Sequence, residues 1–82
     1  MNSAEFLEKL LKLVVSNTEE VKVSEKESIL EVSANNADLG VIIGKGGKNI
    51  RALRNVINLK TAKEGKPRIE IKIREEEKNN GQ

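Results

Sequence analysis

Three glycines within four positions interrupt the most apolar part of this chain. The interrupted stretch runs from Val41 to Ile50 and reads VIIGKGGKNI. Apolar residues recur at helical spacing on both sides of it, which predicts a helix before the glycines and another after them. Gly44 can take the left-handed conformation that ends a helix, and Gly47 stands immediately before the second one. The sequence therefore predicts two helices joined by a very tight turn.

The two helices on either side of the turn each have an apolar face. The first can be capped by Asn35-Asn36, and its apolar face consists of Leu39, Ile42 and Ile43. The second begins near Lys48 and is broken by Gly65 and Pro67. Its apolar stripe is Ile50, Leu53, Val56 and Ile57, and its polar side gathers Lys48, Arg51, Arg54, Asn55 and Asn58.

A further helix is predicted at the N-terminus. Asn2 followed by Glu5 is typical of a helix start at which the acid reaches back to the cap. The apolar face is expected to be Phe6, Leu10, Leu13 and Val14, widened by Leu7 and Leu11. The segment Ser16–Thr18 should end this helix, and Glu8 and Lys12 should form an i,i+4 ion pair.

Three segments alternate between apolar and polar residues, as half-buried strands do: 21–23, 30–34 and 68–74. Only about three residues, Glu25–Glu27, separate the first two strands, so they should form an antiparallel hairpin. A helical connection to the last strand favours parallel pairing there. We expect an α+β domain over residues 3–74: a three-stranded mixed sheet with three helices on one face. Residues 75–82 are expected to form a polar, disordered tail.

Composition narrows the possible functions. The 82 residues suffice for one domain, and the absence of cysteine and histidine excludes thiol and imidazole chemistry. The acids lie away from the glycine turn, so we expect no enzyme and no cofactor. No apolar run approaches the length of a membrane span, and the N-terminus lacks a positively charged signal region. These features predict a cytoplasmic protein that does not bind membranes.

Charge is divided unevenly along the chain. The net charge of +2 combines −4 over residues 1–43, +8 over residues 44–74 and −2 over residues 75–82. A basic half of this kind is expected of a protein that binds a polyanion. The glycine turn adds free backbone N–H groups and the positive end of a helix dipole, which suit a phosphate. The alternative is a plain helix–helix turn with a solvated basic surface.

Two common phosphate-binding motifs do not fit the spacing. A P-loop that began at Gly40 would need its second glycine at Lys45, and the segment Gly44–Lys48 is too short and is followed by Asn49 rather than by a hydroxyl residue. A dinucleotide fingerprint would also need glycine at Asn49, and it joins a strand to a helix rather than two helices. The segment Ile42–Ile50 instead resembles the I-G-x-x-G-x-x-I signature of KH domains, in which the GXXG loop lies between two helices.

The order of elements resembles the type II, or prokaryotic, KH arrangement over roughly residues 3–74. The size of the chain, Asp38-Leu39-Gly40 and the segment Lys60–Lys66 resemble the small stand-alone bacterial members of that family. The resemblance implies a loop that grips about four unpaired nucleotides of RNA. The RNA-binding residues that it implies are Gly44, Lys45, Gly46, Gly47, Lys48, Ile42, Ile43, Ile50, Arg51, Arg54, Lys63 and Lys66, with Arg68 beside the last two. Simple core positions remain the alternative for the isoleucines.

The family further implies an RNA chaperone or post-transcriptional regulator with a link to cell shape and elongation. It implies a homodimer, or a heterodimer with a larger, KhpB-like RNA-binding protein that carries its own KH domain. A protein-interaction module that acts mainly through such a partner is therefore the second hypothesis. The chain has one aromatic residue, Phe6, so stacking of bases on aromatic rings is not expected.

Overall fold

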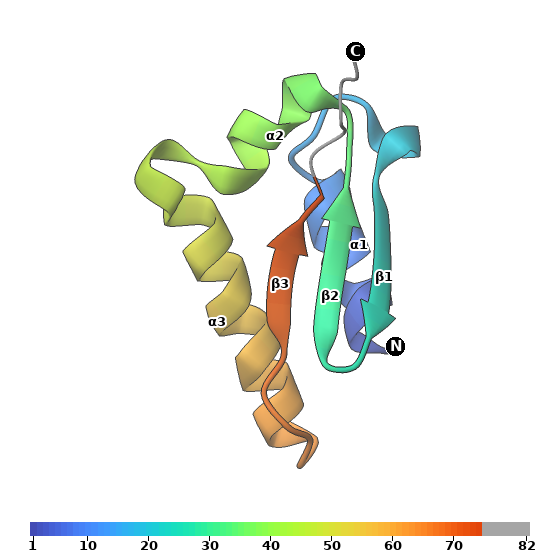
Figure 1. Ribbon diagram of the computed structural model, residues 1–82, viewed down its shortest axis with the longest axis vertical. Coiled ribbons are helices and arrows are strands. Elements are labelled where there is room, and N and C mark those ends of the chain that lie inside the picture. The colour runs from blue at the N-terminus through green and yellow to red at the C-terminus, as the bar shows by residue number, and fades with distance from the viewer. Residues whose placement is uncertain (75–82) are drawn as a thin grey trace.

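A three-stranded sheet lies at the centre of the computed structural model, which describes residues 1–74 (Figure 1). The strands are β1 (Lys22–Lys26), β2 (Ile29–Ser33) and β3 (Glu70–Ile73). Strand β2 is central, paired antiparallel with β1 and parallel with β3. This mixed sheet is the predicted one. The predicted tail lies outside the described residues.

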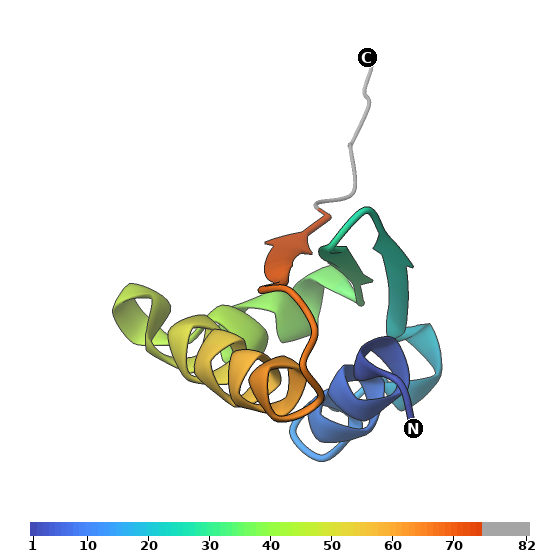
Figure 2. The same ribbon diagram turned by 90° about the horizontal axis from the view of Figure 1, so that it is seen from below.

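Three helices cover one face of the sheet and leave the other face open (Figure 2). They are α1 (Ser3–Lys12), α2 (Asn36–Ile43) and α3 (Lys48–Lys63). Two short 3-10 turns, η1 (Thr18–Glu20) and η2 (Lys45–Gly47), complete the order of elements. The predicted α+β arrangement of a type II KH domain is thus confirmed.

The hairpin between β1 and β2 is tighter than the sequence indicated. The ladder extends to the pair Lys26 and Ile29, so only Glu27 and Ser28 form the turn. Both have positive φ, 53° and 67°, as the two central residues of a type I′ turn require. Neither is glycine or asparagine, so no turn signal marked this position. The amide of Glu70 donates to the carbonyl of Ser28 at 2.9 Å, which links the start of β3 to the turn.

The core forms between the covered sheet face and the three helices. Its buried apolar residues are Leu7, Leu11, Val15, Val21, Leu30, Val32, Ile42, Ile50, Ile57, Ile69 and Ile71. Alternation along the strands correctly predicts the inward positions. Ile69 and Ile71 are buried and Ile73 is partly buried, while the charged residues between them face solvent.

The predicted apolar face of α1 is wrong in its phase. Leu7 and Leu11 are at most 1% exposed and form its centre, whereas Leu13 is 80% and Val14 56% exposed. The helix ends at Lys12, before the predicted stop, so Leu13 and Val14 lie beyond its end. The predicted start is confirmed, because Asn2 and Glu5 form a reciprocal capping box. The predicted ion pair between Glu8 and Lys12 forms at 3.0 Å.

The buried carboxylate of Asp38 fastens the start of α2 to the segment that follows α1. Its oxygens accept from the backbone amides of Ser16 and Asn17, each at 3.0 Å, and from the Asn17 side chain at 3.1 Å. These donors, led by the Ser16 amide, lower the pKa of Asp38 below its ordinary value. A charged group can be buried here because its hydrogen bonds are satisfied within the protein.

Candidate nucleic-acid interface

The loop between α2 and α3 depends on glycine at three positions. Gly44, Gly46 and Gly47 have φ of 79°, 64° and 79°. At Gly44 a side chain is excluded twice, because φ is positive and an added Cβ would lie 2.7 Å from Cγ of Asn49. At Gly46 an added Cβ would meet nothing within 4 Å. The loop therefore packs closely against α3 at Gly44 and faces open space at Gly46.

Two side chains from the first turn of α3 form hydrogen bonds to backbone carbonyls in and next to this loop. The Asn49 amide donates to the carbonyl of Val41 at 2.7 Å, where α2 is ending. The Arg51 guanidinium donates through Nη1 to the carbonyl of Gly46 at 2.8 Å. Sequence reasoning missed the first contact and treated Arg51 as an RNA contact. When a side chain of one helix bonds to the end of the preceding helix, no sequence spacing marks the contact. The contact depends on the angle at which the two helices cross.

Lys45 and Lys48 could contact a ligand, whereas Asn49 and Arg51 bond to the protein backbone. Lys45 and Lys48 are both exposed, and Lys48 is the first residue of α3. The amides of Lys45 and Gly46 begin a 3-10 turn, so they have no acceptor within it. The loop thus combines free N–H donors, two exposed positive charges and the positive end of the α3 dipole. This combination suits one or two phosphate groups.

The three predicted isoleucines are not equivalent. Ile42 is 1% and Ile50 is 7% exposed, and both belong to the core. Ile43 is only partly buried, and Val41, 46% exposed, lies on the same helix. Of the predicted trio, Ile43 alone keeps appreciable surface for a ligand.

Strand β3 lies beside α3, and two α3 side chains bond to the backbone of β3 or of Ile69, the residue just before it. The Asn58 side chain accepts from the amide of Ile69 at 2.8 Å and donates to the carbonyl of the same residue at 3.2 Å. Arg54 donates to the carbonyl of Ile71 at 3.4 Å, a long contact. Arg54, a predicted RNA contact, thus reaches from α3 to the backbone of β3. Asn58, predicted to lie on the polar side of the helix, bonds to the protein backbone instead.

The remaining basic candidates lie at the opposite end of α3 from the loop. Lys63 ends that helix and Lys66 follows it, so about 22 Å of helix separates Lys63 from Lys48. Lys66 lies 3.8 Å from the carboxylate of Glu64. Figure 1 places the glycine loop and this end of α3 far apart.

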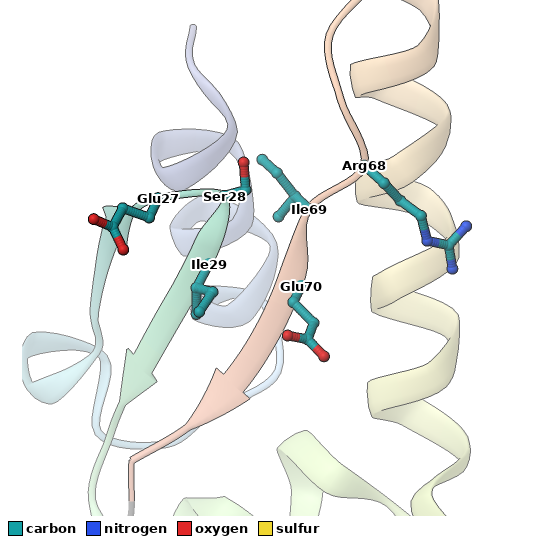
Figure 3. Close-up of a pocket in the computed structure, with 6 residues that line it drawn as sticks. All are labelled: Glu27, Ser28, Ile29, Arg68, Ile69 and Glu70. Atoms are coloured by element: carbon teal, nitrogen blue, oxygen red, sulfur yellow. The ribbon is translucent and has the colours of Figure 1, made fainter.

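An open hollow lies near that far end, where the hairpin turn meets the start of β3. It is lined by Glu27, Ser28, Ile29, Arg68, Ile69 and Glu70. Figure 3 shows the Arg68 side chain directed toward α3 and the Glu27 side chain directed away from it. The charged groups of Arg68 and Glu27 therefore diverge, and no residue of the glycine loop lines the hollow.

None of the helices among residues 1–74 combines the length and the apolar character that crossing a membrane requires. The same residues contain no group of three or more acidic side chains placed to hold a metal ion.

The fold, with its GXXG loop between two helices, defines the class of the protein: a type II KH domain. The family model described as "KhpA/KhpB, KH domain" matches residues 4–73, so the chain belongs to the KhpA/KhpB KH-domain family. Among its relatives, the RNA-binding protein KhpA of Borreliella burgdorferi is 34% identical, over 88% of this chain and 92% of the relative. The RNA-binding protein KhpA of Chlamydia pneumoniae is 36% identical, over 88% and 96%. The protein of that name from Clostridium acetobutylicum is 37% identical, over 84% and 96%.

Proposed function

We propose that this protein binds single-stranded RNA and grips about four nucleotides of its backbone with the loop Gly44–Gly47. The observation that carries the proposal is the loop itself: three positive-φ glycines, free amides and two exposed lysines at the start of a helix. Lys45 and Lys48 would contact phosphates, and Ile43 would lie beside the bases. Lys63, Lys66 and Arg68 would extend the contact only for a longer strand, because they lie at the other end of α3.

The proposed binding is weak and sensitive to salt. The one aromatic ring, Phe6, is partly buried against the core, with Lys60 Nζ 6.0 Å from the ring centre, so stacking on a base is not expected to add to the affinity. Affinity then depends on phosphate contacts, each of which contributes a slope of about −0.7 in log K against log salt on a single strand. A protein that grips unpaired RNA without catalysis fits the role of a cytoplasmic RNA chaperone or post-transcriptional regulator, with the family-implied link to cell shape.

A second candidate function is protein interaction. Val56 and Leu59 on α3 are 41% and 71% exposed, although both are apolar. They offer a surface for a homodimer or for a heterodimer with a KhpB-like partner. Two linked RNA sites would raise the effective affinity of a weak domain. This candidate replaces the first only if the isolated chain has no affinity for RNA of its own.

A fluorescence titration of a short single-stranded RNA at two salt concentrations tests the proposal. The variant Lys45→Asp/Gly46→Asp introduces two carboxylates into the phosphate grip. An added side chain at Gly46 meets open space, and aspartate tolerates positive φ better than most residues, so the fold should persist. We expect the variant to lose at least about tenfold in affinity, or about 1.4 kcal/mol, with an unchanged circular dichroism spectrum.

The matched control is Gly65→Asp/Lys66→Asp. Gly65 also has positive φ, at 73°, with open space at Cβ, and the change in charge is the same. We expect a clearly smaller loss of affinity from the control. Equal losses in the two variants would mean that RNA is attracted by general charge and not held by the loop. Absence of binding by the wild type would favour the protein-interaction module.

A further inference from the structure

Arg51 differs from the other basic residues around the loop because its guanidinium already has a partner. Nη1 donates to the carbonyl oxygen of Gly46 at 2.8 Å. The same nitrogen would lie 3.2 Å from a Cβ added at Gly47, so it occupies the space where a side chain at that position would begin. The Arg51 guanidinium therefore packs against the backbone of the loop.

The bond to Gly46 decides which groups the loop can offer to an anion. A carbonyl oxygen that pointed outward would repel a phosphate. The Gly46 carbonyl is turned toward Arg51 instead. Two other carbonyls of the turn are also engaged: that of Gly44 accepts from the amide of Gly47 at 3.0 Å, and that of Lys45 accepts from the amide of Lys48. These three carbonyl oxygens are thus engaged, and the amides of Lys45 and Gly46 remain as the backbone groups that can bind an anion.

Glycines do not hold such a shape by themselves. Gly46 and Gly47 move freely between positive and negative φ, so an unsupported loop would sample many forms and lose entropy on binding. A charge-assisted hydrogen bond from a helix residue to the centre of the loop restricts that sampling. Asn49 restricts the other side through the carbonyl of Val41.

From this geometry we propose that Arg51 is a positioning residue: it presets the glycine loop for an anionic backbone and contributes to RNA affinity through the shape of the loop, not through contact with a phosphate. The inference rests on the proposed function for its effect on RNA. Its effect on the loop of the free protein can be measured without RNA.

The test compares Arg51→Met with Lys48→Met. Each removes one positive charge from an exposed position in the first turn of α3, and Lys48 is the proposed phosphate contact. For each variant, RNA affinity is measured over a range of salt, and hydrogen exchange of the Gly47 amide is measured in the free protein. We expect Arg51→Met to weaken RNA binding roughly three- to tenfold with an unchanged salt slope, and to exchange the Gly47 amide several-fold faster than the wild type.

Lys48→Met should do the opposite: it should reduce the salt slope by about 0.7 and leave Gly47 exchange unchanged. A loss of salt slope in Arg51→Met equal to that in Lys48→Met would overturn the proposal, since Arg51 would then contact a phosphate. Wild-type exchange at Gly47 in Arg51→Met would also overturn it. If the wild type binds no RNA, the proposed function fails, and the exchange measurement still decides whether Arg51 fixes the loop.

Discussion

At Gly44 the backbone has φ 79° and ψ 166°, and a Cβ would lie 2.8 Å from the backbone nitrogen of Asn49. Backbone atoms of a helix cannot give way as the end of a flexible side chain can. We therefore expect Gly44→Ala to lower the free energy of unfolding by roughly 2–4 kcal/mol, measured by urea denaturation. Gly46→Ala is the control, because it adds positive-φ strain without a clash and should cost about 1 kcal/mol. Equal costs at the two positions would contradict the close packing of the loop at Gly44.

Gly40 has no such constraint, although it lies only four residues away. It is inside helix α2, and an added Cβ would meet nothing within 4 Å. Alanine restricts the unfolded chain and favours the helix, so Gly40→Ala should raise the free energy of unfolding by about 0.4–1 kcal/mol. Thermal denaturation tests this, and a lower melting temperature in Gly40→Ala would contradict the open space found around this position.

Between elements, the Asn58 side chain links helix α3 to the residue just before strand β3. Its side chain satisfies both the amide and the carbonyl of Ile69, which is 8% exposed. Asn58→Ala would leave those groups without partners, so we expect a loss of about 2 kcal/mol of unfolding free energy. Asn55 lies on the same helix and is exposed, so Asn55→Ala should change stability by less than about 0.5 kcal/mol. Similar losses for the two variants would refute the role given to Asn58.

The sequence predicted the elements well and the contacts between them poorly. Strand periodicity correctly placed Ile69 and Ile71 inward, because a two-residue period leaves little choice of face. The sequence did not show which side of α1 faces the core, because apolar residues fill most positions from Phe6 to Val15. Which of them are buried depends on how the helix packs against the sheet. The glycines of the loop were found from their spacing. The roles of Asn49, Arg51 and Asn58 were not, because their partners depend on helix crossing and strand position.

For the molecule as a whole, the response to acid should depend on Asp38. Hydrogen bonds from Ser16 and Asn17 lower the pKa of this carboxyl below 3.8 in the folded chain. Its stabilising contribution is therefore complete above about pH 4, where the unfolded carboxyl is also ionised, and it is lost as pH falls through the folded pKa. Glu64, whose pKa is lowered by Lys60, acts in the same window.

Asp38→Asn should lower the melting temperature by several degrees near neutral pH, and the difference from the wild type should shrink below about pH 4. Glu31→Gln, on the exposed side of β2, is the charge-matched control and should follow the wild-type profile. A difference between Asp38→Asn and wild type that stays constant with pH would show that the ionised carboxylate is not what fastens α2.

RNA is proposed to bind at the glycine loop, Gly44–Gly47. The most direct measurement is a set of ¹H–¹⁵N spectra of the labelled protein, recorded while a short single-stranded RNA is added. We expect the largest amide shifts at Gly44–Lys48, with smaller ones along the first half of α3 and at β3. Shifts confined to the open face of the sheet or to α1, or no shifts at all, would contradict it.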